Sequence, residues 1–240
     1  MSHRLASEHK DFVILGEGNT SAKIDGNRFF VKASGMQLPT IGPDGFCEVD
    51  ADCVMSLLTA DDISEDNVKK VLYESCVLKN GLRPSVETVL HALLLKIEGI
   101  NFIAHTHPVY VNMITCAKNG KDAVQGRLFP DEIVCCGIAP VWIDFTDPGV
   151  PLARAVKAGV EGFIEEQGML PKCVLIQNHG LFAMGRTAAE VESASLMWDK
   201  TARILLGTYL LGGPNYLSPE MSEHILNRPD EKYREKLLFG

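Results

Sequence analysis

The sequence lacks the features that mark several large classes of protein. It has no apolar run of the roughly 18 residues that a membrane span needs. It also has no low-complexity segment, no repeat and no linker rich in Pro, Gly and Ser. The beginning, Met-Ser-His-Arg, is polar and leads into no hydrophobic region, so we expect no signal peptide. We therefore predict a cytoplasmic protein and take residues 1–240 as one domain.

The sequence also has fewer basic than acidic residues and no cysteine pattern that indicates disulfide pairs. The 23 Lys and Arg residues are outnumbered by 31 Asp and Glu, which gives a net charge of −8. This balance argues against a broad surface for nucleic acid or anionic membranes, although a local pocket can still bind a small anion. The seven cysteines are an odd number without a Cys-x-x-Cys motif, which predicts reduced thiols.

Hydrophobic periodicity predicts strands in two settings. Residues 22–25 and 28–33 flank Gly26-Asn27 and are expected to form a hairpin. Further strands are expected at 46–49, 102–104, 132–136, 139–143, 173–177 and 181–184. Helices are expected at 51–58, 64–78, 109–117 and 152–166, and from Ser85 and Thr187, with short helices after Ser218. Strands thus occur both in hairpins and between helices, which favours an α/β fold with a mixed sheet covered on both faces.

Three histidines lie at the ends of predicted strands. The stretch Asn-Phe-Ile-Ala-His-Thr-His-Pro places His105 and His107 two residues apart, so both project to one side of a strand that Pro108 ends. A His-x-His pair alone is equally well explained by one core and one surface histidine. A third histidine, His179, follows another apolar run in Ile-Gln-Asn-His-Gly. Three imidazoles of this kind are typical of a metal site that keeps one position open.

Weak anion-binding signals accompany the histidines. The turn at 16–21, Gly-Glu-Gly-Asn-Thr-Ser, can present backbone N–H groups to a phosphate, and so can Ser34-Gly35 and the helix beginning near Ser85. Each is also an ordinary turn or helix start, but three together make phosphate more plausible. Glu87, two residues after Ser85, is either a helix-stabilising acid or a general base beside a metal.

In order along the chain, these motifs resemble the class II aldolase/adducin family. The matching segments are Gly16-x-Gly18-Asn19-x-Ser21, Lys32-Ala33-Ser34-Gly35, Pro84-Ser85-x-Glu87-x3-His91, His105-Thr106-His107-Pro108 and Asn178-His179-Gly180. The resemblance implies a three-layer αβα sandwich around a mixed, largely antiparallel sheet. It also implies a C4 homotetramer with sites at the subunit interfaces.

The resemblance assigns a role to each matching residue. His105, His107 and His179 match zinc ligands, and Glu87 matches the catalytic acid/base, which can also ligate zinc when substrate is absent. The family positions that hold the phosphate of a small sugar substrate correspond to Gly18, Asn19, Ser34, Gly35 and Ser85. His91, on the same helix as Glu87, is interpreted as a buried hydrogen-bonding residue.

Two segments depart from the family pattern. Aldolases of the family often carry Ser-Ser before the glutamate, whereas this chain has Ser85-Val86 and so lacks one phosphate donor. The tyrosine expected after the histidine helix is replaced by Phe-Pro-Asp-Glu at 129–132, which leaves Tyr209 and Tyr216 as candidate proton donors. The Val-Lys-x-Ser-Gly and Phe-Pro-Asp-Glu forms look more like the aldolase portion of rhamnulose-phosphate aldolase/dehydrogenase proteins.

The leading hypothesis is a zinc-dependent aldolase that cleaves a ketose 1-phosphate to dihydroxyacetone phosphate and an aldehyde through an enediolate. The alternatives within the family are a sugar-phosphate 4-epimerase, a decarboxylase of 3-oxo acid phosphates and a dehydratase. Epimerases of the family tend to have Asp at the position of Glu87, which favours the lyase. The alternative from another class is a non-catalytic scaffold like the adducin head, which generally lacks the complete histidine set.

Overall fold

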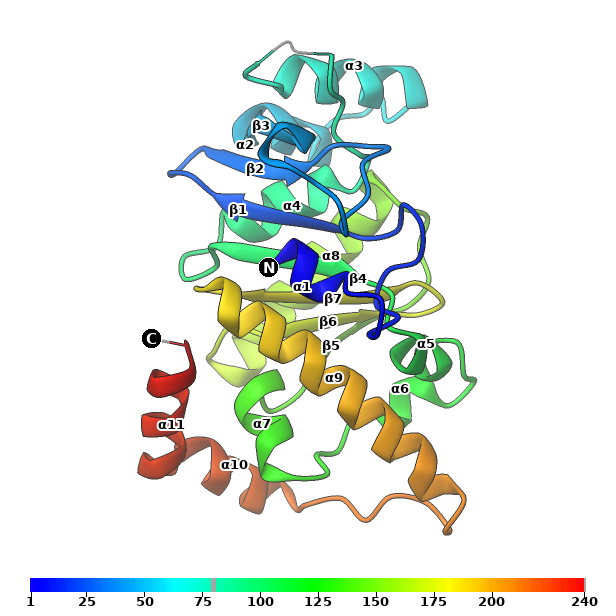
Figure 1. The fold of residues 1–240 in the computed structure, drawn as a ribbon, viewed down its shortest axis with the longest axis vertical. Helices are drawn as coiled ribbons and strands as arrows, with labels where there is room; N and C mark the ends of the chain where they lie inside the picture. The colour runs from blue at the N-terminus through cyan, green and yellow to red at the C-terminus, as the bar shows by residue number, and fades with distance from the viewer. Residues whose placement is uncertain (79–80, 240) are drawn as a thin grey trace.

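Residues 1–78 and 81–239 are described by a computed structural model of the chain (Figure 1). Within them seven strands form one sheet, in the order β3-β2-β1-β4-β7-β6-β5. All neighbouring strands are antiparallel except β5 and β6, so the predicted mixed, largely antiparallel sheet is confirmed. The strands are β1 (Asn19–Lys23), β2 (Arg28–Lys32), β3 (Phe46–Asp50), β4 (Phe102–Thr106), β5 (Val141–Ile143), β6 (Cys173–Ile176) and β7 (Gly180–Gly185).

Helices precede, connect and follow these strands. The α-helices are α1 (Ser2–Leu5), α2 (Ala51–Met55), α3 (Glu65–Ser75), α4 (Thr88–Leu95), α5 (Val109–Thr115), α6 (Gly120–Ala123), α7 (Pro130–Cys136), α8 (Val150–Gln167), α9 (Ala188–Tyr209), α10 (Pro219–Asn227) and α11 (Pro229–Phe239). Two 3₁₀ turns, η1 (Pro43–Gly45) and η2 (Ser56–Leu58), lie before β3 and after α2.

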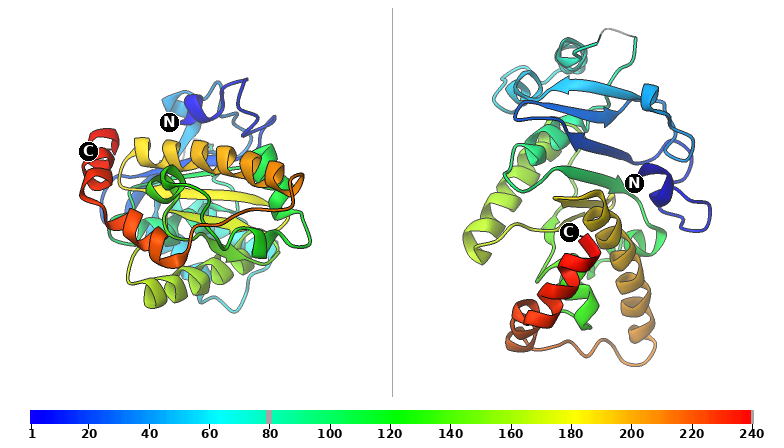
Figure 2. Two further views of the ribbon diagram at one scale, coloured as in Figure 1. Left: turned by 90° about the horizontal axis from the view of Figure 1, so that it is seen from below. Right: turned by 60° about the vertical axis from the view of Figure 1, so that its left-hand side comes forward.

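The sheet separates two apolar layers because side chains alternate along each strand. In β4, Ile103 packs into the layer formed with α4 and α8, whereas Ala104 packs into the layer formed with α5 and α9. Figure 2 (left) shows the sheet between α9 on one side and α8 on the other. The expected three-layer sandwich is thus the observed architecture.

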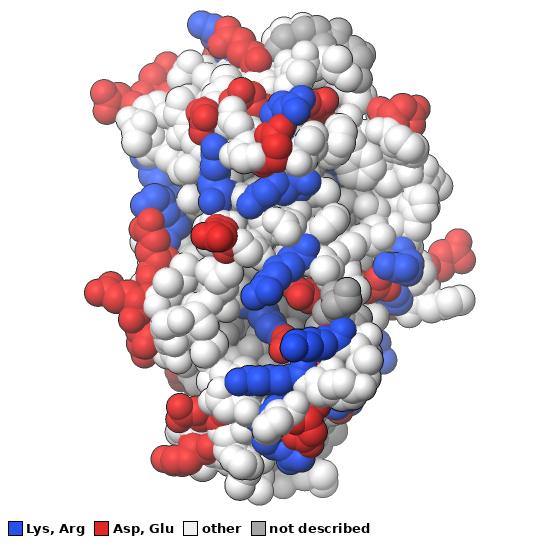
Figure 3. Space-filling model, turned by 90° about the vertical axis from the view of Figure 1, so that its left-hand side faces the viewer, with Lys and Arg blue, Asp and Glu red and all other residues white. Residues whose placement is uncertain are grey.

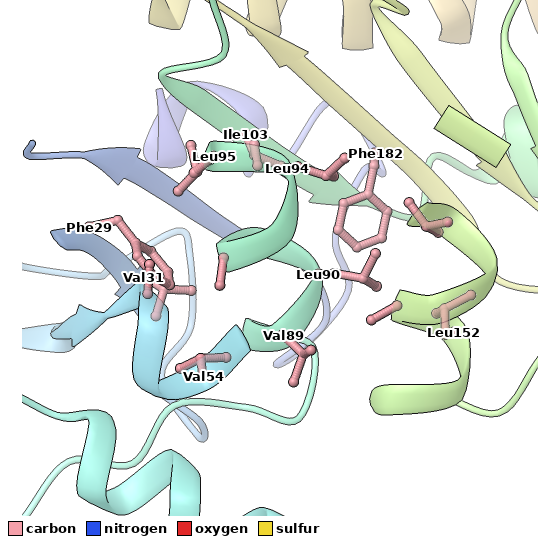
Figure 4. Close-up of a cluster of buried hydrophobic side chains, with 14 of the residues drawn as sticks. Phe29, Val31, Val54, Val89, Leu90, Leu94, Leu95, Ile103, Leu152 and Phe182 are labelled. Carbon is pink, nitrogen blue, oxygen red and sulfur yellow. The ribbon is translucent and has the colours of Figure 1, made fainter. Parts of the chain in front are cut away.

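The layer between the sheet and α4 is made of large aliphatic and aromatic side chains. Leu90 from α4, Leu152 from α8 and Phe182 from β7 point toward one another in Figure 4, and all three are fully buried. Every described residue of α4 is buried, including His91. This packing fixes the start of α4, and therefore Glu87, relative to β4 and β7.

Two local predictions are wrong. Residues 132–136 do not form a strand, because α7 (Pro130–Cys136) covers them. Pro130 occupies the first turn, where its missing N–H costs no hydrogen bond, and the acids that follow it favour a helix start. The helix expected from Ser85 begins only at Thr88, with Glu87 at its N-cap position, so the Ser85 side chain does not cap it.

Strand direction places the candidate site at one end of the central strands β4 and β7. Thr106, at the end of β4, pairs with Leu181 near the start of β7, so the loops after β4 and before β7 meet. Arg186 follows the opposite end of β7. There it lines a cavity of about 650 Å³ together with Lys172, Lys232 and Lys236. Figure 3 shows a band of basic side chains on the face that corresponds to the left-hand side of Figure 1.

None of the helices in the described part of the chain combines the length and the apolar character needed to cross a membrane.

A buried ion pair between Arg127, which precedes α7, and Glu132 in its first turn is expected to be important for stability. Arg127 and Glu132 are 2% and 1% exposed, and Arg127 Nη1 lies 2.6 Å from Glu132 Oε1. Replacing Arg127 by methionine should lower the free energy of unfolding by about 3–5 kcal/mol, because the Glu132 carboxylate would stay buried without its partner. Urea denaturation measures this change. Lys157→Met, which removes the exposed pair with Glu161, should cost less than about 1 kcal/mol; equal losses in both variants would contradict the prediction.

Candidate active site

The three predicted histidines converge at the edge where β4 ends and β7 begins. His105 is the fourth residue of β4, His107 follows the strand, and His179 sits in the turn between β6 and β7. The Nε2 atom of His105 lies 2.9 Å from Nε2 of His107 and 3.2 Å from Nε2 of His179. One ligand atom from each ring can be chosen so that all lie within 4.8 Å of one another.

The orientation of His105 leaves its Nε2 atom available as a ligand. Its ring stacks on Phe182, with the centroids 4.1 Å apart and the planes 13° apart. The Nδ1 atom is 3.1 Å from the carbonyl oxygen of Leu181. Because a carbonyl only accepts, Nδ1 carries the proton and Nε2 has a free lone pair. Burial, together with the neighbouring His105 and His179, lowers the pKa of His107 to about 3, so its ring is neutral near pH 7.

These donors fit a divalent metal ion. With metal–nitrogen bonds of about 2.0–2.1 Å, ligand atoms at the corners of a tetrahedron lie roughly 3.3 Å apart. The Nε2–Nε2 distances of 2.9 and 3.2 Å from His105 are close to this spacing. The cluster can therefore hold a divalent cation with a coordination position left over.

Glu87 approaches the same point from the other side. Its Oε1 atom is 3.1 Å from Nε2 of His179 and 3.4 Å from Nε2 of His105. Burial opposes ionisation of this carboxyl group, but the two histidines outweigh it and hold the pKa well below its usual range. The site therefore has a carboxylate beside the three imidazoles.

A hydrogen-bond chain holds Glu87 in place. Asn19 Nδ2 donates to Glu87 Oε2 at 2.6 Å, and the Asn19 Oδ1 atom accepts from Nε2 of His91. The Nδ1 atom of His91 then accepts from the Ser21 hydroxyl at 2.7 Å. Burial lowers the pKa of His91 to about 3, which keeps its ring neutral. His91 is the buried hydrogen-bonding residue that the sequence predicted.

The residues predicted to bind phosphate separate into two groups. Ser34 and Ser85 line one cavity, and Gly35 lies beside Ser34 with a φ of 81°. Asn19 instead donates one N–H to Glu87 and accepts from His91 through Oδ1, so the second N–H of its amide remains for another acceptor. Gly18 has a φ of 66°, and a Cβ there would lie 2.7 Å from the carbonyl oxygen of His105.

Two charged residues near the site have contacts that the sequence did not predict. Lys32 is buried, and its Nζ donates to the carbonyl of Met36 at 2.7 Å and to that of Gly16 at 3.3 Å. It thus ties the glycine-rich loop to the Ser34 turn. Glu17 Oε2 lies 3.8 Å from Nδ1 of His107. Both residues belong to the glycine-rich and Lys-Ala-Ser-Gly motifs, but only the fold shows their partners.

The two candidate tyrosines differ in availability. The Tyr216 hydroxyl donates to the carbonyl of Ala123 at 2.7 Å, and burial raises its pKa to about 12. Tyr209, at the end of α9, is 53% exposed. Tyr209 is therefore the better placed of the two to reach a site on a neighbouring molecule.

Gly180 allows the histidine loops to pack closely. A Cβ at this position would lie 2.7 Å from Cδ2 of His107 and 2.7 Å from the carbonyl oxygen of Thr106. Gly180→Ala should therefore displace His107 and cost about 1–3 kcal/mol of stability, with weaker metal binding. Thermal unfolding and metal titration measure both effects. Gly162→Ala has no atom within 4 Å of its Cβ and lies inside α8, so it should not lower stability and should leave metal binding unchanged; a normal metal affinity in Gly180→Ala would refute the packing role.

The fold is thus a mixed sheet between two helical layers, with a glutamate beside three histidines that could hold a metal ion. The model for the Class II Aldolase and Adducin N-terminal domain matches residues 2–206, so the chain belongs to this family.

The similar proteins carry names that describe different activities. The chain is 30% identical over 201 residues to methylthioribulose-1-phosphate dehydratase of Geobacillus kaustophilus, covering 79% of this chain and 81% of that protein. It is 29% identical over 184 residues to the uncharacterized oxidoreductase YuxG of Bacillus subtilis, but this match spans 72% of the chain and only 24% of YuxG. The solved structure of an L-fuculose 1-phosphate aldolase superposes with a TM-score of 0.71 at 18% identity, covering 97% of this chain and 92% of that one.

Proposed function

We propose that the protein is a zinc-dependent aldolase that cleaves a ketose 1-phosphate into dihydroxyacetone phosphate and an aldehyde. The observation that carries this proposal is the convergence of Glu87 with His105 and His179, whose Nε2 atoms lie 3.4 and 3.1 Å from its Oε1 atom, respectively. A scaffold has no use for a carboxylate held against imidazoles. Nitrogen ligands in this number suit zinc, although other divalent ions also bind imidazole.

The chemistry follows from the donor set. A divalent ion on three neutral imidazoles would keep its full charge, polarise the substrate carbonyl and stabilise the enediolate left when the C3–C4 bond breaks. Glu87 is ionised and can take a proton from, or return it to, the carbon that becomes nucleophilic. Asn19 fixes the carboxylate through Oε2, which leaves Oε1 to face the substrate.

The phosphate is proposed to bind between the two turns that carry Ser34, Gly35 and Ser85. Ser34 and Ser85 line the same cavity, and Ser34 N–H donates to the carbonyl of Arg83 at 2.8 Å, which holds the two segments together. Gly18 brings the glycine-rich loop against β4, next to His105.

A homotetramer is proposed as the active form. Large apolar side chains are exposed on α5, which follows the histidine strand, and at the end of α9, which packs against α5. Leu210 and Leu211 are 88% and 91% exposed, and Met113 is 50% exposed. Covering such side chains with neighbouring copies is favourable. It would also bring Tyr209 toward a site on another subunit.

The second candidate is a dehydratase of a ketose 1-phosphate, which the Geobacillus relative favours by its name and coverage. A dehydratase needs the same cation and a carboxylate that moves a proton next to a carbonyl. Epimerase and decarboxylase activities need a similar site, and the family comparison alone does not separate them.

Product analysis separates these reactions. We would incubate the full-length, zinc-loaded protein with a panel that includes L-fuculose 1-phosphate and methylthioribulose 1-phosphate. The proposal predicts that at least one ketose 1-phosphate yields equal amounts of dihydroxyacetone phosphate and aldehyde, and that His105→Ala yields neither. Loss of water, release of CO2 or formation of an epimer without any aldehyde would reject the aldolase and assign the corresponding rival.

A further inference from the structure

A cavity of about 950 Å³ adjoins the proposed phosphate position. It is bounded on one side by Ser34, Ser85 and Val86 and on the other by residues of α3. Its charged lining residues are Asp66, Lys69, Lys70 and Arg83. An anion bound at the two serines would therefore face several cationic side chains.

Arg83 differs from the two lysines in having no charged partner in the part of the chain that the structure describes. Lys69 Nζ lies 2.7 Å from Glu65, and Lys70 Nζ lies 4.0 Å from Glu74. The Arg83 guanidinium has no ion pair or side-chain hydrogen bond with any residue in 1–78 or 81–239. Its charge is therefore available to a ligand.

The backbone fixes Arg83 beside the predicted phosphate donors. Its carbonyl accepts from Ser34 N–H at 2.8 Å, and the next residue, Pro84, forms a β-bridge with Ala33. The Ser85 hydroxyl has no hydrogen-bond partner among the described residues. Arg83, with a free guanidinium, and Ser85, with an unpartnered hydroxyl, thus lie two positions apart on one segment and line the same cavity.

The distance to the histidines suits a small phosphorylated substrate. Glu87 is two positions after Ser85, so their Cα atoms are at most roughly 7 Å apart. Glu87 reaches the histidine cluster directly. A short sugar phosphate can thus place its carbonyl at the histidines while its phosphate lies at Ser85.

We propose that Arg83 binds the phosphate dianion of the substrate and supplies the donor that is lost where Val86 stands in place of a second serine. A planar guanidinium can donate two hydrogen bonds to two phosphate oxygens. Because the guanidinium is charged, each of these hydrogen bonds is stronger than one donated by a hydroxyl. Arg83 is then a residue that selects phosphorylated over unphosphorylated substrates. This inference rests on the proposed function.

Two hydroxamates that differ only by a phosphate test the assignment. Phosphoglycolohydroxamate and glycolohydroxamate share the metal-binding group, so the ratio of their dissociation constants, measured by calorimetry on the full-length zinc-loaded protein, reports the phosphate contacts alone. Arg83→Met should shrink this ratio roughly 10- to 100-fold, as expected for lost hydrogen bonds to a charged group, and leave glycolohydroxamate binding unchanged.

Matched variants make the result specific. Arg186→Met removes the same charge at the opposite end of the sheet and should leave the ratio unaltered. Adding Val86→Ser to Arg83→Met should restore part of the phosphate preference. An unchanged ratio in Arg83→Met, with both compounds bound normally, would overturn the role of Arg83. Failure of the unmutated protein to bind either hydroxamate would instead overturn the metal site and the proposed function.

Discussion

Replacing Glu87 by glutamine is expected to lower turnover by at least ~10²-fold, the usual contribution of a positioned acid or base. The amide keeps the shape of the side chain but cannot accept a proton at the pH where the carboxylate does. Because the imidazoles remain, the variant should still bind one metal ion per chain. Steady-state rates on the true substrate, together with metal analysis of the same sample, measure both quantities.

Glu17 provides the control for this substitution. Its carboxylate also lies near a histidine ring, 3.8 Å from Nδ1 of His107, but on the ring atom that points away from the cluster. Because 3.8 Å is too long for a hydrogen bond, Glu17→Gln removes only a more distant charge, and its turnover should fall less than about 10-fold. Equal turnover of Glu87→Gln and the unmutated protein would remove Glu87 from the mechanism.

Replacing His179 by alanine should weaken metal binding by more than ~100-fold, because even residues that only orient metal ligands contribute 10- to 100-fold. His179 supplies the one imidazole that comes from the β6–β7 turn, so no other described residue can take its place at the cluster. Competition with a chromogenic chelator measures the affinity, and turnover should fall with it.

The matched control for His179 is a histidine far from the cluster. His224 lies on α10 and is exposed, so His224→Ala should bind metal normally. A His179→Ala variant that binds metal as tightly as His224→Ala would show that the ion, if any, sits elsewhere.

The sequence was sufficient for the features that depend on local pattern. Short apolar runs predicted β4, β6 and β7, and the turn breakers beside them placed His105, His107 and His179 at strand ends. The order of the motifs then led to the family that the comparison assigns. The sheet type followed because strands occur both in hairpins and between helices.

Features that depend on tertiary contacts could not be predicted in this way. The hydrogen bonds from the Asn19 amide to Glu87 and His91 were not predicted, because they depend on how β1 and α4 pack together. The pattern of a short apolar segment such as 132–136 is compatible with a strand or a helix. Pro130 and the two acidic residues after it favour the start of a helix. The position of Arg83 in the same cavity as Ser34 depends on the pairing of two loops far apart in sequence.

The central claim is that one cation is held by three imidazoles from two separate parts of the fold. A crystal structure of the full-length protein grown with zinc, using anomalous scattering at the zinc edge, tests it most directly. We predict one ion per chain, about 2.0–2.1 Å from the Nε2 atoms of His105, His107 and His179. A protein that binds no stoichiometric zinc, or binds it away from these atoms, would contradict the claim and favour a scaffold with an aldolase fold.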